Sequence, residues 1–164
     1  HPGSAFLHQL EMSSPGAATT VLMEGTRPLL TEIQALVVPS AIPTPRRVAE
    51  GVKLSRLNVI CAVLQKHARL KLGDKDIFVN AVGGIKAHEP AADLAIALAI
   101  ASSVKNKPLP KQTVAIGEVG LLGEIRPVSF TEKRRKEAKK LEYDQALGVT
   151  RGQTLASLVK DLFG

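Results

Sequence analysis

The feature that most constrains this sequence is the stretch 76–101, which joins an apolar strand pattern to an alanine-rich helix pattern. Residues 77–82 are nearly continuously apolar, with β-branched and aromatic members, a pattern typical of a strand covered on both faces. Gly83 and Gly84 favour a turn, because glycine tolerates backbone angles that other residues avoid. Pro90 suits the first turn of a helix. A helix so rich in alanine is expected to pack closely against its neighbours.

Length and composition indicate one globular domain with a nucleic-acid partner. The chain has 164 residues, of which 45% are hydrophobic and 23% charged. Aromatic residues make up only 3%, so we expect an aliphatic core and few platforms for stacking bases. The formal net charge of +7 favours a polyanion, with nucleic acid ahead of an anionic membrane surface. The alternative is a protein with scattered lysines and no such partner.

Cysteine usage and hydropathy limit the kinds of site and the cellular compartment that we expect. The one cysteine, Cys61, excludes an internal disulfide and a zinc site of several cysteines, and its apolar helical surroundings indicate a buried hydrophobe. The longest apolar run, 94–101, is far shorter than the ~20 residues of a membrane-spanning helix. No signal peptide is visible, so we expect a cytoplasmic protein with no membrane partner.

The order of hydrophobic periods predicts an α+β (mixed α/β) single domain over residues 18–164, preceded by a flexible tail or linker over 1–17. Arg46 and Arg47 are predicted to form a basic turn before the first helix, and Thr131 to cap a helix. The predicted strands are 19–24 and 29–38 as a hairpin, then 77–82, 113–116, 124–128 and 146–149; the predicted helices are 54–69, 90–104, 132–141 and 155–163.

Several candidate sites have simpler explanations. The glycines around 83–84 and 117–123 match neither a Walker loop nor a dinucleotide fingerprint, and so favour turns. Glu89 and Asp93 are four residues apart and suit a metal, but acidic side chains near a helix start are also favoured by the helix dipole, so we predict no metal site. Ser129 stands alone in the sequence, with no base beside it.

Four motifs in order resemble the C-terminal domain of the bacterial RadA (Sms) DNA repair family. They are EGTRPLLTEIQAL (24–36), DIFVNAVGG (76–84), EPAADLA (89–95) and GEVGLLGEIRPV (117–128), and the resemblance covers about residues 18–163. That domain is in turn similar to the proteolytic domain of Lon proteases, which implies the Lon-like fold of the ribosomal-protein-like superfamily.

The Lon resemblance also implies what has been lost. Lon-type proteases use a serine–lysine dyad, in which the lysine takes the proton from the attacking serine. The matching positions here are Ala91 and Glu132, so both halves of the dyad are missing. The resemblance therefore implies a degenerate site with no catalytic residue, in which the fold serves another purpose.

The RadA resemblance implies partners. Family members are RecA-like motors that drive branch migration in homologous recombination, with a zinc module and an ATPase domain ahead of this one. This chain has one cysteine and no Walker motif, so it resembles a fragment that needs no ATP, Mg²⁺ or Zn²⁺ of its own. The family's domain forms a hexameric ring and offers a basic surface to DNA, both single-stranded and branched, without sequence preference.

Clusters of cations indicate the candidate DNA contacts, since lysine and arginine supply sequence-independent affinity for phosphate. The loop 105–111 and the later part of the 132–141 helix, with Lys139 and Lys140, belong to the same set. The principal candidates are Arg46, Arg47, Arg56, Arg69, Lys71, Arg134, Arg135 and Lys136. Two alternatives stay open: an oligomerisation scaffold without DNA contact, and an active peptidase with a relocated nucleophile such as Ser129.

Overall fold

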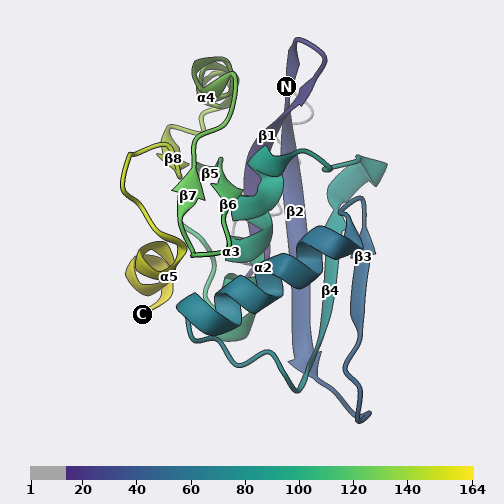
Figure 1. Cartoon of the computed structure of the whole chain (residues 1–164). Helices are drawn as coiled ribbons and strands as arrows, with labels where there is room; N and C mark the ends of the chain where they lie inside the picture. Colours follow the sequence, from purple (N-terminus) through teal and green to yellow (C-terminus); the bar gives the residue numbers. More distant parts are fainter. Residues whose placement is uncertain (1–13) are drawn as a thin grey trace.

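The structure is a computed structural model that describes residues 14–164, so residues 1–13 of the predicted tail (1–17) lie outside the described residues. Figure 1 shows a long twisted sheet crossed by helices. The six strands lie in the order β3-β4-β2-β1-β5-β8, with parallel pairs at both ends and antiparallel pairs in the middle. They are β1 (Ala17–Glu24), β2 (Arg27–Pro39), β3 (Arg47–Glu50), β4 (Lys75–Ala81), β5 (Thr113–Ala115) and β8 (Gln145–Leu147). This arrangement confirms a mixed α/β domain.

The predicted hairpin is confirmed as β1 and β2, paired from Ala17↔Gln34 to Glu24↔Arg27. The first strand begins at Ala17 rather than at the predicted residue 19. Gly16 is already part of the fold, because its N–H donates to the Ser102 hydroxyl at 2.9 Å and its carbonyl accepts from the Ala35 N–H at 2.7 Å. Gly16 and Ala17, which belong to the predicted tail, are therefore bonded to α3 and β2.

Helix α3 (Asp93–Lys105) is the centre of the core, and its residues 93–102 are all buried. It packs on β1 and β2 on one side and on α2 (Leu54–His67) and α5 (Leu155–Phe163) on the other (Figure 1). Alanine at alternate positions lets these elements approach the helix axis closely. The helix is preceded by one 3-10 turn, η2 (Pro90–Ala92), and ends at Asn106 in a left-handed conformation.

The opposite face of the sheet is only half covered. Helix α4 (Thr131–Lys140) packs on β1 and β2, where Val21 and Leu30 form a small second cluster with Ala138 and Tyr143. Beyond α4, over β3, β4 and the end of β2, no described helix covers this face, and Leu36 remains 55% exposed. The prediction that 77–82 is covered on both faces is therefore wrong: β4 alternates between side chains under α2 and α3 and side chains on the open face.

Two short pairings were not predicted as such. The predicted basic turn at Arg46 and Arg47 instead leads into β3, a four-residue edge strand parallel to β4. The glycine-rich segment forms an antiparallel hairpin of β6 (Glu118–Val119) and β7 (Ile125–Arg126). A second 3-10 turn, η1 (Val82–Gly84), follows β4. The observed strand therefore ends at Ala81, one residue before the predicted end at 82. Strands this short contain too few residues to show a period.

The helix starts differ in how they are capped. Thr131 is not the N-cap of α4: that position is Phe130, and the Thr131 hydroxyl donates to the Val128 carbonyl at 2.9 Å. Helix α5, by contrast, begins with a capping box in which Thr154 and Ser157 exchange side-chain and backbone hydrogen bonds. The remaining predicted helices are confirmed to within a few residues.

Candidate functional site

A hollow of about 350 Å³ lies where the end of β1, the start of α3 and the start of α4 meet. Its walls include Glu89, Ala91, Ser129, Phe130 and Arg134. The two positions matched to a serine–lysine dyad flank this region in the chain, since Ala91 precedes α3 and Glu132 belongs to the first turn of α4.

Ala91 lines the hollow and is buried, and its backbone is hydrogen-bonded to Gly117. It is 1% exposed, and its carbonyl accepts the Gly117 N–H at 3.1 Å, while the Leu94 N–H donates to the Gly117 carbonyl at 3.1 Å. These two bonds attach the helix start to the segment before β6. The side chain at this well-ordered position is a methyl group, which has no proton to lose and no lone pair for nucleophilic attack.

Glu132 points to solvent. Its side chain is 89% exposed, its one ion pair within residues 14–164 is with Arg135 at 3.7 Å, and it is not among the residues lining the hollow. Ser129 does line the hollow, but within residues 14–164 its hydroxyl has no hydrogen bond to a lysine or histidine. The described residues of the hollow thus contain no paired nucleophile and base.

A buried ion pair occupies the side of the hollow, and neither partner was predicted to have this role. Arg134 is 3% exposed; it donates to Glu89 Oε1, to the Val21 carbonyl at 2.9 Å and to the Ser129 carbonyl at 2.9 Å. Glu89 Oε2 accepts the Met23 N–H at 2.8 Å. The pair therefore links α4 to β1 and to the loop before α3. Arg134 was predicted to contact DNA, but its burial and its three partners leave no guanidinium surface for a phosphate.

Arg56 also forms an ion pair that links distant elements of the chain. Its Nη2 lies 2.5 Å from Asp93 Oδ2 and 3.2 Å from the Val119 carbonyl, so α2 is tied to the start of α3 and to β6. Asp93 is 2% exposed and also accepts the Val119 N–H at 3.1 Å. Burial raises the pKa of Asp93 above its usual value, and the hydrogen bond from Arg56 opposes that rise. Asp93 thus joins two distant elements as well as lying in the first turn of α3.

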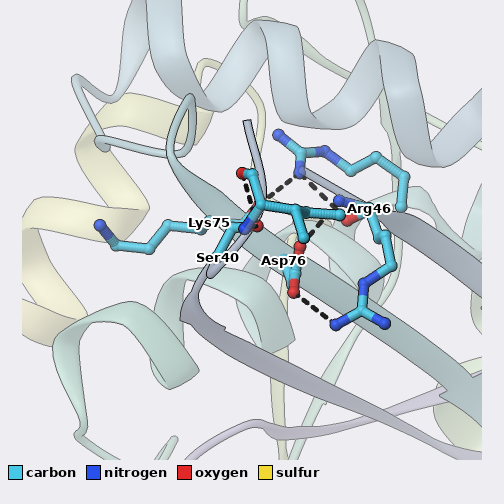
Figure 2. Close-up of polar contacts among 6 residues, drawn as sticks. Ser40, Arg46, Lys75 and Asp76 are labelled. Carbon is cyan, nitrogen blue, oxygen red and sulfur yellow. Dashed lines mark hydrogen bonds and ion pairs between the residues drawn. The ribbon is translucent and has the colours of Figure 1, made fainter. Parts of the chain in front are cut away.

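Arg46 and Arg47 form hydrogen bonds at the edge of the sheet, and Figure 2 shows Arg46 beside Asp76. Arg46 donates through its N–H and its guanidinium to Asp76, at 2.8 Å each, and these bonds lower the pKa of that buried carboxyl from 3.8 to about 2. Arg47 donates to the Lys75 carbonyl at 2.5 Å and to the Leu72 carbonyl at 3.0 Å. Both arginines have structural partners, although the Arg46 side chain stays 60% exposed.

Arg69 and Lys71 are exposed in the loop after α2. In Figure 1 this loop leaves the end of α2 low in the view, whereas α4 lies at the top. The structure therefore does not bring these two cations together with those of α4 into one patch.

The solvent side of α4 carries the densest group of free cations. Lys133, Lys136, Lys139 and Lys140 are all exposed, and at 100° per residue they share the side opposite the buried Arg134 and Ala138. We call these four residues the lysine face. Among the described ion pairs only Lys140 takes part, at 3.8 Å from Glu137. Arg135 is half-buried beside the face. Lys133 was not among the predicted contacts, although its spacing from Lys136 and Lys140 was a usable signal.

The chain is similar to known proteins over most of its length. The family described as "Subunit ChlI of Mg-chelatase" matches residues 48–149. Proteins named DNA repair protein RadA are 49% identical in Haemophilus influenzae and 48% in Escherichia coli, over 90% of this chain and 32% of those proteins. The Streptococcus pneumoniae protein of that name is 41% identical over 99% of this chain and 39% of its own length. The chain thus spans about a third of the length of these relatives. Within residues 14–164, no helix has the length and hydropathy to cross a membrane.

Proposed function

We propose, from the premise that this chain belongs to the family described as "Subunit ChlI of Mg-chelatase" and has RadA proteins as relatives, that it is a non-catalytic, DNA-binding module of a DNA repair protein. The observation that carries this proposal is the lysine face of α4. The relatives' name points to DNA, and the lysine face supplies the chemistry that DNA requires.

Four ammonium groups on one side of a helix suit a phosphate backbone. A lysine contact to phosphate releases condensed counterions, so it adds affinity for any sequence and weakens as salt rises. Lys133, Lys136 and Lys139 have no ion pair among the described residues and lose no internal partner when they meet a phosphate. The side chains project from a helix anchored by Arg134, so the surface that carries them is rigid.

The residues of the hollow are consistent with a module that has no catalytic activity. We propose that it is the remnant of a Lon-like proteolytic site, in a Lon-like fold, with Ala91 and Glu132 in place of the dyad. The methyl group of Ala91 cannot attack a carbonyl, and the exposed Glu132 is not among the residues lining the hollow. The other proposals follow from the resemblance: a role in recombination, assembly into a hexameric ring, and ATP, Mg²⁺ and Zn²⁺ only on other parts of the longer proteins.

Fluorescence anisotropy with labelled DNA tests this proposal. The variant changes Lys133, Lys136, Lys139 and Lys140 to Gln, and its matched control changes the exposed Lys53, Lys66, Lys86 and Lys160 to Gln, so both lose four charges. We expect the α4 variant to lose most of its affinity and the slope of log K against log salt to fall by ~0.7 per lost phosphate contact on a single strand. Equal losses in both variants would mean that net charge alone attracts DNA.

An oligomerisation scaffold is the second candidate, and the open half of the sheet favours it. Leu36 and Val48 are 55% and 40% exposed there, and they flank Phe78 in one row across β2, β4 and β3. Light scattering that shows a ring, combined with anisotropy that shows no DNA affinity, would support this candidate. A peptidase based on Ser129 requires casein turnover that Ser129→Ala abolishes; no turnover by the unmodified chain excludes it.

A further inference from the structure

Phe130 has an unusual conformation for an aromatic residue. It occupies the N-cap of α4 with φ 58° and ψ 31°, in the left-handed region, and makes no side-chain cap hydrogen bond. Asn, Asp, Ser and Thr are the preferred N-cap residues, and glycine or asparagine adopts this backbone conformation at lower cost. The ring gains little from packing either, since the residue is 54% exposed. A strained backbone that presents an apolar ring to solvent suggests a binding role.

The backbone around Phe130 is fixed by the buried arginine. The Arg134 N–H donates to the Phe130 carbonyl at 3.0 Å, and the Arg134 guanidinium donates to the neighbouring Ser129 carbonyl at 2.9 Å. The Thr131 hydroxyl bonds to Val128 on the other side. The ring is therefore held at the rim of the hollow by rigid structure. Within residues 14–164 it is the one aromatic residue that is more than half exposed.

The lysine face begins one turn beyond this ring. From Lys133 to Lys140 it extends ~10 Å along the helix at ~1.5 Å per residue. An exposed aromatic ring beside a row of cations is the combination that binds single-stranded nucleic acid: the ring stacks on a base and the cations follow the backbone. Glu118 lines the hollow, so its negative charge disfavours phosphates there. Glu132 lies exposed in the first turn of α4.

We propose that Phe130 stacks on an unpaired base while the lysine face holds the adjoining phosphates, so that this site binds single-stranded DNA in preference to duplex. In a duplex each base already stacks on its neighbours and offers no free face to the ring. Stacking is tolerant of sequence because every base has a π-face. This inference rests on the proposed function and adds to it the form of DNA that is bound and the residue that selects it.

The test compares a labelled oligothymidine with a mixed-sequence duplex of the same length by anisotropy. Phe130→Ala is expected to lower the single-strand affinity ~5- to 100-fold, the range for one lost stacking contact, and to change the duplex affinity less than ~2-fold. Phe130→Tyr should keep the preference. The matched control is Leu122→Ala, which removes a 78% exposed apolar side chain from the β6–β7 turn and should change neither affinity.

Two further variants test whether residue 130 contacts the DNA and whether loss of binding could come from loss of folding. The chain has no tryptophan, so Phe130→Trp introduces one fluorophore, which we expect oligothymidine to quench. Phe130→Gly removes the ring and relieves the left-handed strain, so it should lose single-strand affinity while its thermal midpoint stays the same or rises.

The outcomes separate the two proposals. If the lysine variant loses DNA binding but Phe130→Ala keeps the single-strand preference, or if Phe130→Trp is not quenched, this inference is overturned and the proposed function stands. If the unmodified chain binds neither DNA, both fall. If poly-glutamate competes as well as oligothymidine and depends equally on Phe130, the site takes an acidic peptide and this inference is wrong.

Discussion

Four arginines and four lysines of this molecule differ in what their side chains contact. Arg46, Arg47, Arg56 and Arg134 donate through their guanidinium groups to carboxylates and backbone carbonyls of the protein. We call them the arginine framework. The lysine face of α4 meets no such partners and lies in solvent. These two groups of cations therefore contribute differently to the +7 charge: the four arginines have partners within the protein, whereas the lysine face is free to meet another molecule.

The chemistry of the side chains explains this division. A guanidinium offers several donors in a planar fork, which suits two or three fixed acceptors at once, whereas an ammonium is a compact, strongly hydrated charge on a flexible stem. Arg134 uses this fork to bind three acceptors in different elements. An arginine that has a buried partner is expensive to remove, while an exposed lysine is nearly neutral for stability.

Arg134→Met tests the framework most severely. It leaves Glu89 without its cation and the Val21 and Ser129 carbonyls without their donor, so we expect a loss of ~3–5 kcal/mol in the free energy of unfolding. Urea unfolding followed by circular dichroism measures it. Arg134→Lys is the control, because it keeps the charge but not the fork, and an intermediate loss is expected. A fully stable Arg134→Lys variant would show that charge alone matters.

The second prediction concerns acid. The pKa of Asp76 falls from 3.8 to about 2 in the folded protein, because Arg46 hydrogen-bonds to the carboxylate. Between these values the unfolded chain holds more protons than the folded one, so this contribution to stability is complete above about pH 4 and is lost as the pH falls toward 2. Asp76→Asn should be less stable at neutral pH and lose less stability across that range in urea titrations.

Asp93 provides the contrasting case. Burial raises its pKa, so the folded protein binds this proton more readily than the unfolded chain, and the contribution of Asp93 to stability grows as the pH falls through the raised value. Asp93→Asn should remove a pH dependence of the opposite sign. If both variants changed the acid profile in the same direction, the assignment of the two carboxyls to different environments would be incorrect.

Glu132 gives a smaller effect on binding. Its carboxylate is fully solvated at the start of α4, and a charge ~7 Å from a phosphate in water contributes ~0.6 kcal/mol of repulsion. Glu132→Gln should therefore raise DNA affinity ~3-fold at low salt, and the gain should shrink as salt increases. Anisotropy measures both. Asp161→Asn, which removes an exposed charge from α5, is the control and should leave the affinity unchanged.

The smallest expected effect is on the stability of a lysine variant. Lys136→Met removes a charge that has no ion pair among the described residues, so we expect a change within about 0.5 kcal/mol in the free energy of unfolding. Urea unfolding alongside Arg134→Met compares two cations of the same helix directly. A loss comparable to that of Arg134→Met would abolish the distinction between framework and face.

Local patterns predicted much of the fold. The hairpin, the alanine-rich helix and the last helix have long hydrophobic periods, and these encode the element and its buried side together. The edge strand β3 and strand β6 were not predicted because four and two residues carry no period, and their conformation depends on the strand beside them. The predicted strand 124–128 is present only as the two residues of β7.

The site was less predictable, because its contacts join distant residues. Nothing local shows that Arg134 reaches Glu89 or that Arg56 reaches Asp93, since a run of cations looks alike whether its members are buried or exposed. Helical spacing separates them in part, as Arg134 and Ala138 share one side of α4 and the lysines the other. Phe130 had a signal too: an aromatic residue stands where a helix start prefers a small polar one.

The reactivity of Cys61 toward a thiol reagent reports on local unfolding of this molecule. Cys61 is a buried residue of α2, 3% exposed, and burial raises the pKa of its thiol to about 11, so almost none of it is thiolate near neutral pH. Because it is the only cysteine in the chain, a thiol reagent reports on one position. The reaction proceeds through states in which α2 has lifted from the sheet, and its rate measures how often that happens while the rest of the protein stays folded.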